Sequence, residues 1–332
     1  KKELIENQSI LKMINLISNI KIRDKSGTYI GARMGRPEKA KMRKMNGSPH
    51  SLFPVGEEGG RLRSFQSALE IGKIKSDFPN YVCDKCKKNT ILPVCETCES
   101  LTLPLFFCQT CGLIKDKLCK THGYTKSYTE QEVDINHFFK LAAKKSNGVI
   151  PKLIKGVKST SNKDHKPENL VKGIIRARHN LYVNKDGTIR YDASELTCTH
   201  FKPKEINVEV EKLKELGYDK DYLGKELTSN NQILEIKPQD IILPSCPVSP
   251  DERSDDVIFN ITKFVDDLLV NFYSMEPFYN IKSKKDLIGH YILGLAPHTS
   301  AAMVGRIIGF SQTQGFLAHP YFHAAERRDT DG

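Results

Sequence analysis

The chain has 332 residues, of which 39% are hydrophobic and 27% charged, and these values exclude both a disordered polymer and a single small domain. Its formal net charge of +11 favours an anionic partner. No run of about 18 uncharged apolar residues occurs, which excludes a membrane-spanning helix. The chain starts at Lys1 without a signal-peptide pattern, so we expect an internal piece of a larger cytoplasmic protein.

Positive charge is concentrated at the N-terminal end, where residues 1–50 contain 12 Lys and Arg against 4 Asp and Glu. This favours nucleic acid as the partner. Apolar spacing over residues 3–20 is typical of an amphipathic helix, and short strands broken by glycine turns are expected after it. A basic loop shaped by Gly35 and Pro37 follows, and only Glu38 opposes its charge. Its cationic residues are Arg33, Arg36, Lys39, Lys41, Arg43 and Lys44.

The basic loop combines two kinds of cation. Arginine offers a planar fork for phosphate oxygens, whereas lysine is a compact point charge. A shaped loop that carries both can clamp a phosphate chain and neutralise the charge that develops during phosphoryl transfer. The alternative interpretation is a solvated charged face.

Seven of the nine cysteines lie between positions 83 and 119. They form four half-sites with two residues between the ligands, and the last half-site ends in histidine. The candidate ligands are Cys83, Cys86, Cys95, Cys98, Cys108, Cys111, Cys119 and His122. This spacing predicts two structural Zn²⁺ sites in a reducing cytosol rather than a disulfide framework. It leaves open whether the half-sites group sequentially or in a cross-brace.

The rest of the sequence alternates between strand and helix patterns. Asp-Gly at 186–187 is a strong tight-turn signal, which predicts a hairpin over residues 180–192. Ser254 is expected to cap a helix that has Asp255 and Asp256 in its first turn. The other expected elements are a short helix over 207–218 that ends at Gly217, a strand, turn and strand over 232–244, and a β-rich unit from residue 286.

The sequence stops soon after two aspartates, Asp329 and Asp331, which are one residue apart. On an extended strand both carboxylates point the same way, and a divalent cation removes their repulsion. Two carboxylates on Mg²⁺ that face a basic loop are the minimum for nucleotidyl transfer by the two-metal route. The alternative is an ordinary solvated turn. We interpret His298, His319 and His323 as structural, because a two-metal site does not require them.

Several long blocks carry a resemblance to a known family. They include "GTYIGARMGRPEKAKMRKM", "LFPVGEEGGRLRSFQSA", "GLAPHTSAAMVGRIIGF" and "HPYFHAAERR", and they run in family order over nearly the whole chain. The chain resembles the large subunit of the archaeal family D DNA polymerases. The resemblance implies a mixed, mainly β catalytic core of two double-psi β-barrels with inserted zinc modules and helical spacers. It also implies replicative DNA synthesis from dNTPs on primer-template DNA, a small exonuclease subunit as partner, and a sliding clamp.

The resemblance further implies the site residues. The catalytic acids of the family lie in an Asn-x-Asp-Gly-Asp motif, in which Asp331 takes the first acid position and would bind Mg²⁺. Asp329 stands where the family has asparagine, so it either assists the metal as a further catalytic residue or only lies near it. The second acid would follow Gly332. We therefore expect a fragment that is inactive alone. In the basic loop the resemblance gives the catalytic role to Lys41, Lys44 and Lys39, and phosphate or DNA contacts to Arg33, Arg36 and Arg43.

These expectations divide the chain into five segments. The segments are 1–80 for the first part of barrel 1 with the basic loop, 81–124 for the zinc module, 125–250 for the remainder of barrel 1, 251–285 for a helical spacer, and 286–332 for the start of barrel 2, cut in the acidic motif.

Two other function classes remain as alternatives to a DNA polymerase. The first alternative is a non-catalytic zinc-containing scaffold that binds nucleic acid. The second is an RNA-synthesising relative with the same barrels. All three predict salt-sensitive binding to nucleic acid.

Overall fold

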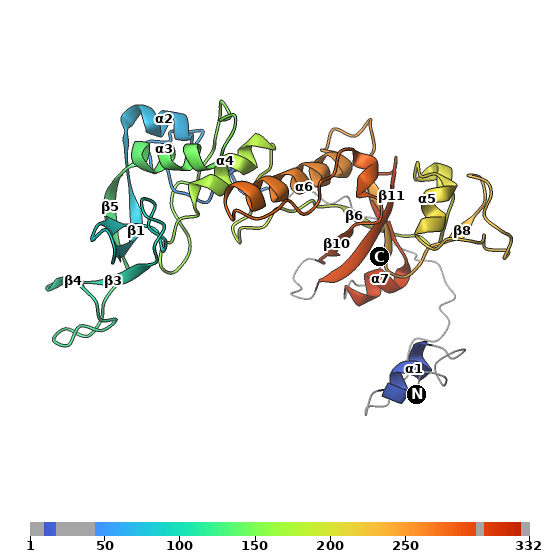
Figure 1. Ribbon diagram of the computed structural model, residues 1–332, viewed down its shortest axis with the longest axis horizontal. Coiled ribbons are helices and arrows are strands. Elements are labelled where there is room, and N and C mark those ends of the chain that lie inside the picture. Colours follow the sequence, from blue (N-terminus) through green and yellow to red (C-terminus); the bar gives the residue numbers. More distant parts are fainter. Residues whose placement is uncertain (1–9, 18–43, 297–301, 327–332) are drawn as a thin grey trace. The chain divides into compact units, whose positions relative to one another are not determined.

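The chain divides into two compact units in the computed structural model (Figure 1). The described residues are 10–17, 44–296 and 302–326. One unit consists of Lys1–Arg36 with Asp329–Gly332, and the other of Pro37–Arg328. In the first unit, helix α1 (Ile10–Ile17) confirms part of the helix expected over residues 3–20. None of the described helices is long and apolar enough to cross a bilayer.

The first half of the second unit is an antiparallel sheet with three helices. The sheet has the order β2-β1-β3-β4, and β5 also pairs with β1. The elements in chain order are α2 (Phe65–Ile71), β1 (Lys73–Cys83), β2 (Asn89–Thr90), β3 (Thr102–Cys108), β4 (Gly112–Ile114), β5 (Tyr128–Asp134), α3 (Ile135–Lys145) and α4 (Leu170–Arg178).

Strand β1 connects the core of this half to the cysteine block. Its residues 73–79 pair with β5, and its residues 80–83 pair with β3. Ile74 and Phe78 are fully buried, as expected for residues that share one face of a strand. Because β1 ends at Cys83, the first metal-ligand candidate is attached directly to a strand that the core holds in place.

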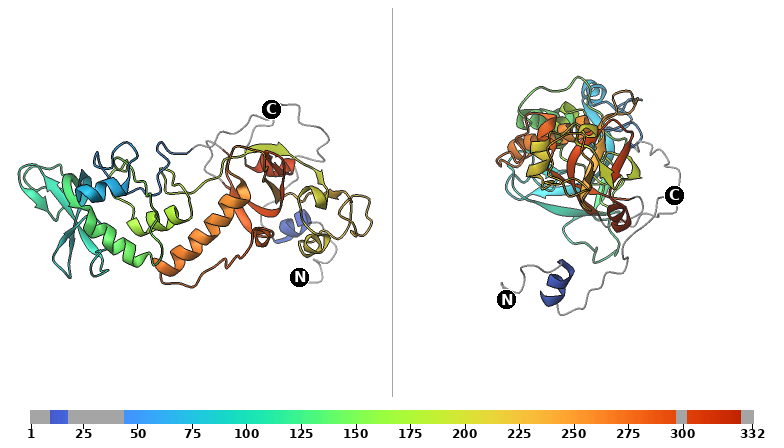
Figure 2. Two further views of the ribbon diagram at one scale, coloured as in Figure 1. Left: turned by 90° about the horizontal axis from the view of Figure 1, so that it is seen from above. Right: turned by 90° about the vertical axis from the view of Figure 1, so that its right-hand side faces the viewer.

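A phenylalanine cluster forms the centre of the first core. The Phe53 ring lies 6.1 Å from Phe65, 6.0 Å from Phe78 and 6.2 Å from Phe138, in tilted arrangements. Helix α6 (Ser254–Asn271) packs against α4, and the left view of Figure 2 shows α6 as the long orange helix. Its Phe264 is part of this core. The packing of α6 on this core agrees with its apolar stripe in the sequence.

The second sheet is mixed and has the order β10-β11-β9-β12-β6. Two pairs of adjacent strands in this sheet are parallel, β9 with β11 and β6 with β12, although the two strands of each pair are distant in sequence. The strands are β6 (Ser194–Thr197), β9 (Asp240–Pro244), β10 (Tyr291–Gly294), β11 (Met303–Ser311) and β12 (Gly315–Ala318). The neighbouring elements are β7 (His200–Phe201), η1 (Pro203–Glu205), α5 (Val210–Glu215), β8 (Leu234–Glu235), η2 (Lys284–Leu287) and α7 (Pro320–Ala325).

A buried ion pair joins two strands of this sheet. Arg306 on β11 donates from Nε and Nη2 to both oxygens of Asp240 on β9, each at 2.8 Å. Tyr218 donates its hydroxyl to the same carboxylate at 2.5 Å. Asp240 is 2% exposed, and this bidentate geometry compensates for the loss of its hydration.

Two sequence-based expectations need correction, and a third is not confirmed. Residues 180–192 contain the tight turn, in which the Asn184 N–H donates to the Thr188 carbonyl at 2.9 Å, but no strand pairing extends from it. Ser254 does not cap α6; the cap residue is Arg253, and the Ser254 hydroxyl donates to the Pro244 carbonyl instead. The fold is mixed α/β with several sheets, and the described residues form no closed barrel, so the expected double-psi architecture is not confirmed.

Candidate functional site

The first four cysteine ligands converge on one point. The Sγ atoms of Cys83, Cys86, Cys95 and Cys98 all lie within 4.8 Å of one another, and those of Cys83 and Cys98 are 3.4 Å apart. Thiolates that share a tetrahedral zinc ion at about 2.3 Å are separated by about 3.8 Å. This set therefore has the composition and spacing for one Zn²⁺ ion.

The second set has the same organisation. The ligand atoms of Cys108, Cys111, Cys119 and His122 lie within 4.8 Å of one another. His122 Nδ1 is 3.6 Å from the sulfurs of Cys108 and Cys119 and 3.3 Å from that of Cys111. Nitrogen and sulfur ligands of one tetrahedral zinc ion are about 3.6 Å apart. The eight candidate ligands therefore group sequentially along the chain and not in a cross-brace, the two arrangements that the spacing left open.

Each of the four half-sites is a tight turn whose fifth residue has a positive φ. In the second cluster these residues are Gly112 (φ 76°) and Gly123 (φ 74°), which adopt this conformation without strain. In the first cluster they are Lys87 (φ 58°) and Glu99 (φ 56°), for which it is unfavourable. The turn closes through the backbone, for example by the 2.8 Å bond from the Lys87 N–H to the Cys83 carbonyl.

The crowded thiols of the first cluster oppose each other's ionisation. Hydrogen bonds from Ser100 lower the pKa of Cys98 to about 6. The neighbouring Cys98 in turn raises the pKa of the Cys86 thiol to about 12. Without a cation the cluster therefore favours few thiolates, whereas a divalent ion would allow all four to ionise.

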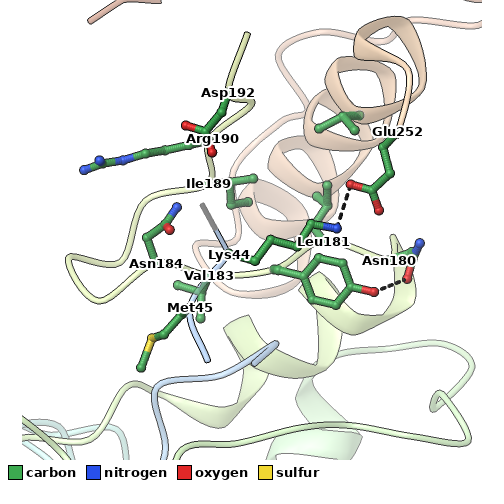
Figure 3. Close-up of a pocket in the computed structure, with 12 residues that line it drawn as sticks. Lys44, Met45, Asn180, Leu181, Val183, Asn184, Ile189, Arg190, Asp192 and Glu252 are labelled. Carbon is green, nitrogen blue, oxygen red and sulfur yellow. Dashed lines mark hydrogen bonds and ion pairs between the residues drawn. The ribbon is translucent and has the colours of Figure 1, made fainter. Parts of the chain in front are cut away.

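Lys44 lies in the part of the basic loop that the structure describes. Its Nζ is 2.9 Å from Glu252 Oε2 and 4.5 Å from the centroid of the Tyr182 ring (Figure 3). Tyr182 stacks in turn on His50 at a centroid distance of 5.2 Å. The ammonium group is thus held by an ion pair and a cation–π contact, and it remains partly open to solvent.

The Lys44 side chain lines a pocket between the 180–192 segment and the start of α6. Arg190, whose guanidinium pairs with Asp186, adds a second cation to its wall. The other lining residues are Met45, Asn180, Leu181, Tyr182, Val183, Asn184, Ile189, Asp192, Glu252 and Val257. Such a mixed surface can bind an anion at the lysine while its apolar wall limits access by water.

Sequence reasoning missed Glu252 and Tyr182, because neither belongs to a recognisable motif. His319 has the structural role that we expected: its Nδ1 accepts a hydrogen bond from the Tyr321 N–H at 3.1 Å and caps α7. The other proposed site residues lie outside the described residues, so the structure does not place them. They are Arg33, Arg36, Lys39, Lys41, Arg43, Asp329 and Asp331, and the same holds for His298.

Comparison with known proteins gives consistent matches along the chain. A sequence profile described as "DNA polymerase II large subunit DP2, catalytic domain" matches residues 145–332, and the profile of the central domain of that subunit matches residues 1–117. The chain is 46% identical to the DNA polymerase II large subunit of Archaeoglobus fulgidus, over 99% of this chain and 29% of that protein.

Two further relatives give the same result. The DNA polymerase II large subunit of Nanoarchaeum equitans is 44% identical over 100% of this chain and 30% of the relative. That of Pyrococcus furiosus is 42% identical over 98% of this chain and 26% of the relative. The chain therefore spans less than a third of the length of these relatives.

Proposed function

Because this chain belongs to the family of DNA polymerase II large subunits, we propose that the intact protein is a replicative, DNA-directed DNA polymerase. It extends a primer 3′ end with dNTPs on a DNA template. The observation that carries the proposal is that the catalytic-domain profile covers residues 145–332 while the central-domain profile covers residues 1–117. A small exonuclease subunit and a sliding clamp are its proposed partners. The 332 residues alone are proposed to be inactive, because they span 29% of such a relative.

The proposed catalytic acids are Asp331 and a carboxylate that follows Gly332 in the intact protein. Mg²⁺ bound by them would lower the cost of forming the attacking alkoxide and neutralise the leaving pyrophosphate. Asp329 takes the asparagine position of the family motif, where it either assists the metal or only lies near it.

The proposed cationic side of the site is the basic loop. Lys41, Lys44 and Lys39 stabilise the charge that develops on the phosphates of the incoming nucleotide. The position of the Lys44 ammonium group, between Glu252 and Tyr182, supports this role, because it is held before any ligand arrives. The guanidinium groups of the loop position phosphate oxygens without reading the base sequence.

The two cysteine clusters are proposed to be structural zinc sites. All four positions of each ion are filled by protein ligands, which leaves none for a reacting water. The five segments with the boundaries given above, including the two double-psi barrels and the zinc module at 81–124, also stay proposals.

Primer extension separates this proposal from a non-catalytic scaffold that binds nucleic acid. The intact large subunit, assembled with its small subunit, should incorporate dNTPs in the order that the template dictates, and only with Mg²⁺. A scaffold would bind primer-template with the same salt dependence, but neither Mg²⁺ nor dNTP would lead to extension. Preferential incorporation of ribonucleotides would instead indicate an RNA-synthesising relative.

A further inference from the structure

A buried histidine lies between two carboxylates beside the second sheet. Glu195 is on β6, His323 is on α7, and Glu326 is the residue at the C-terminal end of that helix. One side-chain atom of each lies within 4.8 Å of the others. This cluster shares no residue with the two cysteine sets or with the Lys44 pocket.

Hydrogen bonding fixes the orientation of the His323 ring. Nε2 lies 3.0 Å from the carbonyl oxygen of Leu196, which only accepts, so Nε2 carries a proton. Nδ1 therefore faces the carboxylates, 3.5 Å from Glu195 Oε2 and 3.7 Å from Glu326 Oε2. Histidines that bind a metal through one nitrogen commonly donate the other N–H to a backbone carbonyl in this way.

The separations in this cluster suit a shared ion better than direct hydrogen bonds. A charge-assisted N–H···O bond is about 2.7–2.9 Å long, which is shorter than both distances from Nδ1. Nitrogen and oxygen ligands held at about 2.0–2.2 Å from a tetrahedral ion lie about 3.3–3.6 Å apart. The observed 3.5 and 3.7 Å are close to the second value.

The surroundings of the cluster are apolar and close-packed. His323 is 1% exposed and Glu326 is 2% exposed, and among the described residues nothing hydrogen-bonds to His323 Nδ1 or to Glu326 Oε2. The rings of Phe316 and Phe322 lie edge-on to the imidazole, at 5.4 and 6.2 Å. Gly294 packs so closely that a Cβ there would lie 2.3 Å from Glu326 Oε1. A carboxylate as buried as that of Glu326 requires compensating positive charge.

We propose that Glu195 Oε2, His323 Nδ1 and Glu326 Oε2 bind one divalent transition-metal ion, of which Zn²⁺ is the reference case. One imidazole nitrogen and two carboxylate oxygens are ligands that Zn²⁺ accepts, whereas Mg²⁺ favours oxygen ligands and several waters. The ion joins α7 to the edge strand β6.

A proton on Nδ1 is the competing occupant of the cluster. Burial lowers the pKa of His323, but the neighbouring carboxylates of Glu195 and Glu326 and the hydrogen bond to the Leu196 carbonyl outweigh this and raise the pKa to about 9. A protonated ring brings one positive charge into the cluster, whereas a divalent ion brings two.

Zinc content distinguishes the two occupants. By mass spectrometry of the metals in the purified intact large subunit, the wild type should hold one zinc ion more than the His323→Gln and the Glu326→Gln variants. His319→Gln is the matched control, because His319 caps the same helix and contacts neither carboxylate ligand. Its zinc content should equal that of the wild type. Equal zinc content in the wild type and both cluster variants would overturn the proposal.

A measurement on the wild-type protein tests the same proposal if the substituted variants do not fold. The ring nitrogens of His323 in the wild-type protein can be observed by ¹⁵N NMR, in which a metal-bound Nδ1 differs from a protonated one. We expect a metal-bound Nδ1 beside a protonated Nε2. A doubly protonated His323 ring in the zinc-loaded protein would assign the cluster to the proton and contradict the metal site.

Discussion

Lys44 Nζ lies 2.9 Å from Glu252 Oε2, so a lysine of the basic loop pairs with a carboxylate located just before helix α6. The pair is partly exposed, at 32% and 38% of the two side chains. An ion pair with this exposure contributes little to stability. The ion pair therefore fixes the position of the Lys44 ammonium group, and it adds little to the stability of the fold.

Replacement of Lys44 tests its proposed part in catalysis. Lys44→Ala in the intact polymerase should lower the rate of nucleotide incorporation about 100-fold, in the range observed when one group that stabilises developing charge is removed. Glu252→Gln keeps the lysine charge and should change the rate by no more than a few-fold. Single-turnover primer extension measures both. Similar losses in the two variants would mean that the pair is structural.

The sequential grouping of the metal ligands makes a prediction about pairs of substitutions. Cys83→Ser with Cys95→Ser removes two ligands of one cluster, so the protein should lose one zinc ion. Cys83→Ser with Cys108→Ser damages both clusters and should cost two zinc ions. A cross-brace would give the reverse result, and Cys198→Ser is a control outside both clusters. Elemental analysis of the purified variants decides between the arrangements.

The positive φ of Lys87 and Glu99 predicts a stabilising substitution. Lys87→Gly and Glu99→Gly should each raise the free energy of unfolding of the zinc-loaded protein by about 0.5–1 kcal/mol, because glycine adopts this conformation without strain. The control is Lys85→Gly in the same turn, where φ is not positive and glycine should destabilise. Chemical denaturation measures these differences, and a loss of stability at both positions would rule out strain in the turns.

Asp255 should make stability depend on pH in strong acid. Burial raises its pKa, but hydrogen bonds from Arg253, Lys284 and Ser245 outweigh this and lower the pKa to about 2. The unfolded chain then binds this proton more readily. The contribution of about 2 kcal/mol is therefore complete above pH ~4 and is lost as the pH falls towards 2.

The Asp255→Asn variant isolates this contribution. The difference in unfolding free energy between wild type and variant should shrink as the pH falls from about 4 to about 2. Asp116→Asn, at an exposed position, is the comparison. A difference that stays constant over this range would mean that Asp255 is not the titrating group.

The sequence was sufficient for elements whose signals are local. The spacing of the cysteines identified all eight candidate ligands that the structure brings together in two groups, because a half-site is a short turn whose chemistry stands in consecutive residues. Gly217, with φ 88°, ends the region of helix α5 as expected. The strand, turn and strand over 232–244 also appear as β8 and β9, although they belong to different sheets.

The features that the sequence could not supply depend on contacts between distant segments. The hairpin over 180–192 has its turn, but the flanking residues form no strand pairs: Leu181 packs into the first core, and Tyr182 and Val183 line the Lys44 pocket. Arg253 replaced Ser254 as the cap residue because the Ser254 hydroxyl bonds to Pro244 of β9. The His323 cluster joins β6 to α7, and no spacing rule connects Glu195 with a residue so far along the chain.

The central claim is that Asp331 belongs to a catalytic metal site that works with the lysines of the basic loop. It is tested most directly by primer extension with intact polymerase that carries Asp331→Asn, beside Asp329→Asn, which restores the usual residue of the family motif. We predict that the first variant loses incorporation by about three orders of magnitude or more while its affinity for primer-template changes little, and that the second stays active. Wild-type extension rates in the Asp331→Asn enzyme would contradict the account.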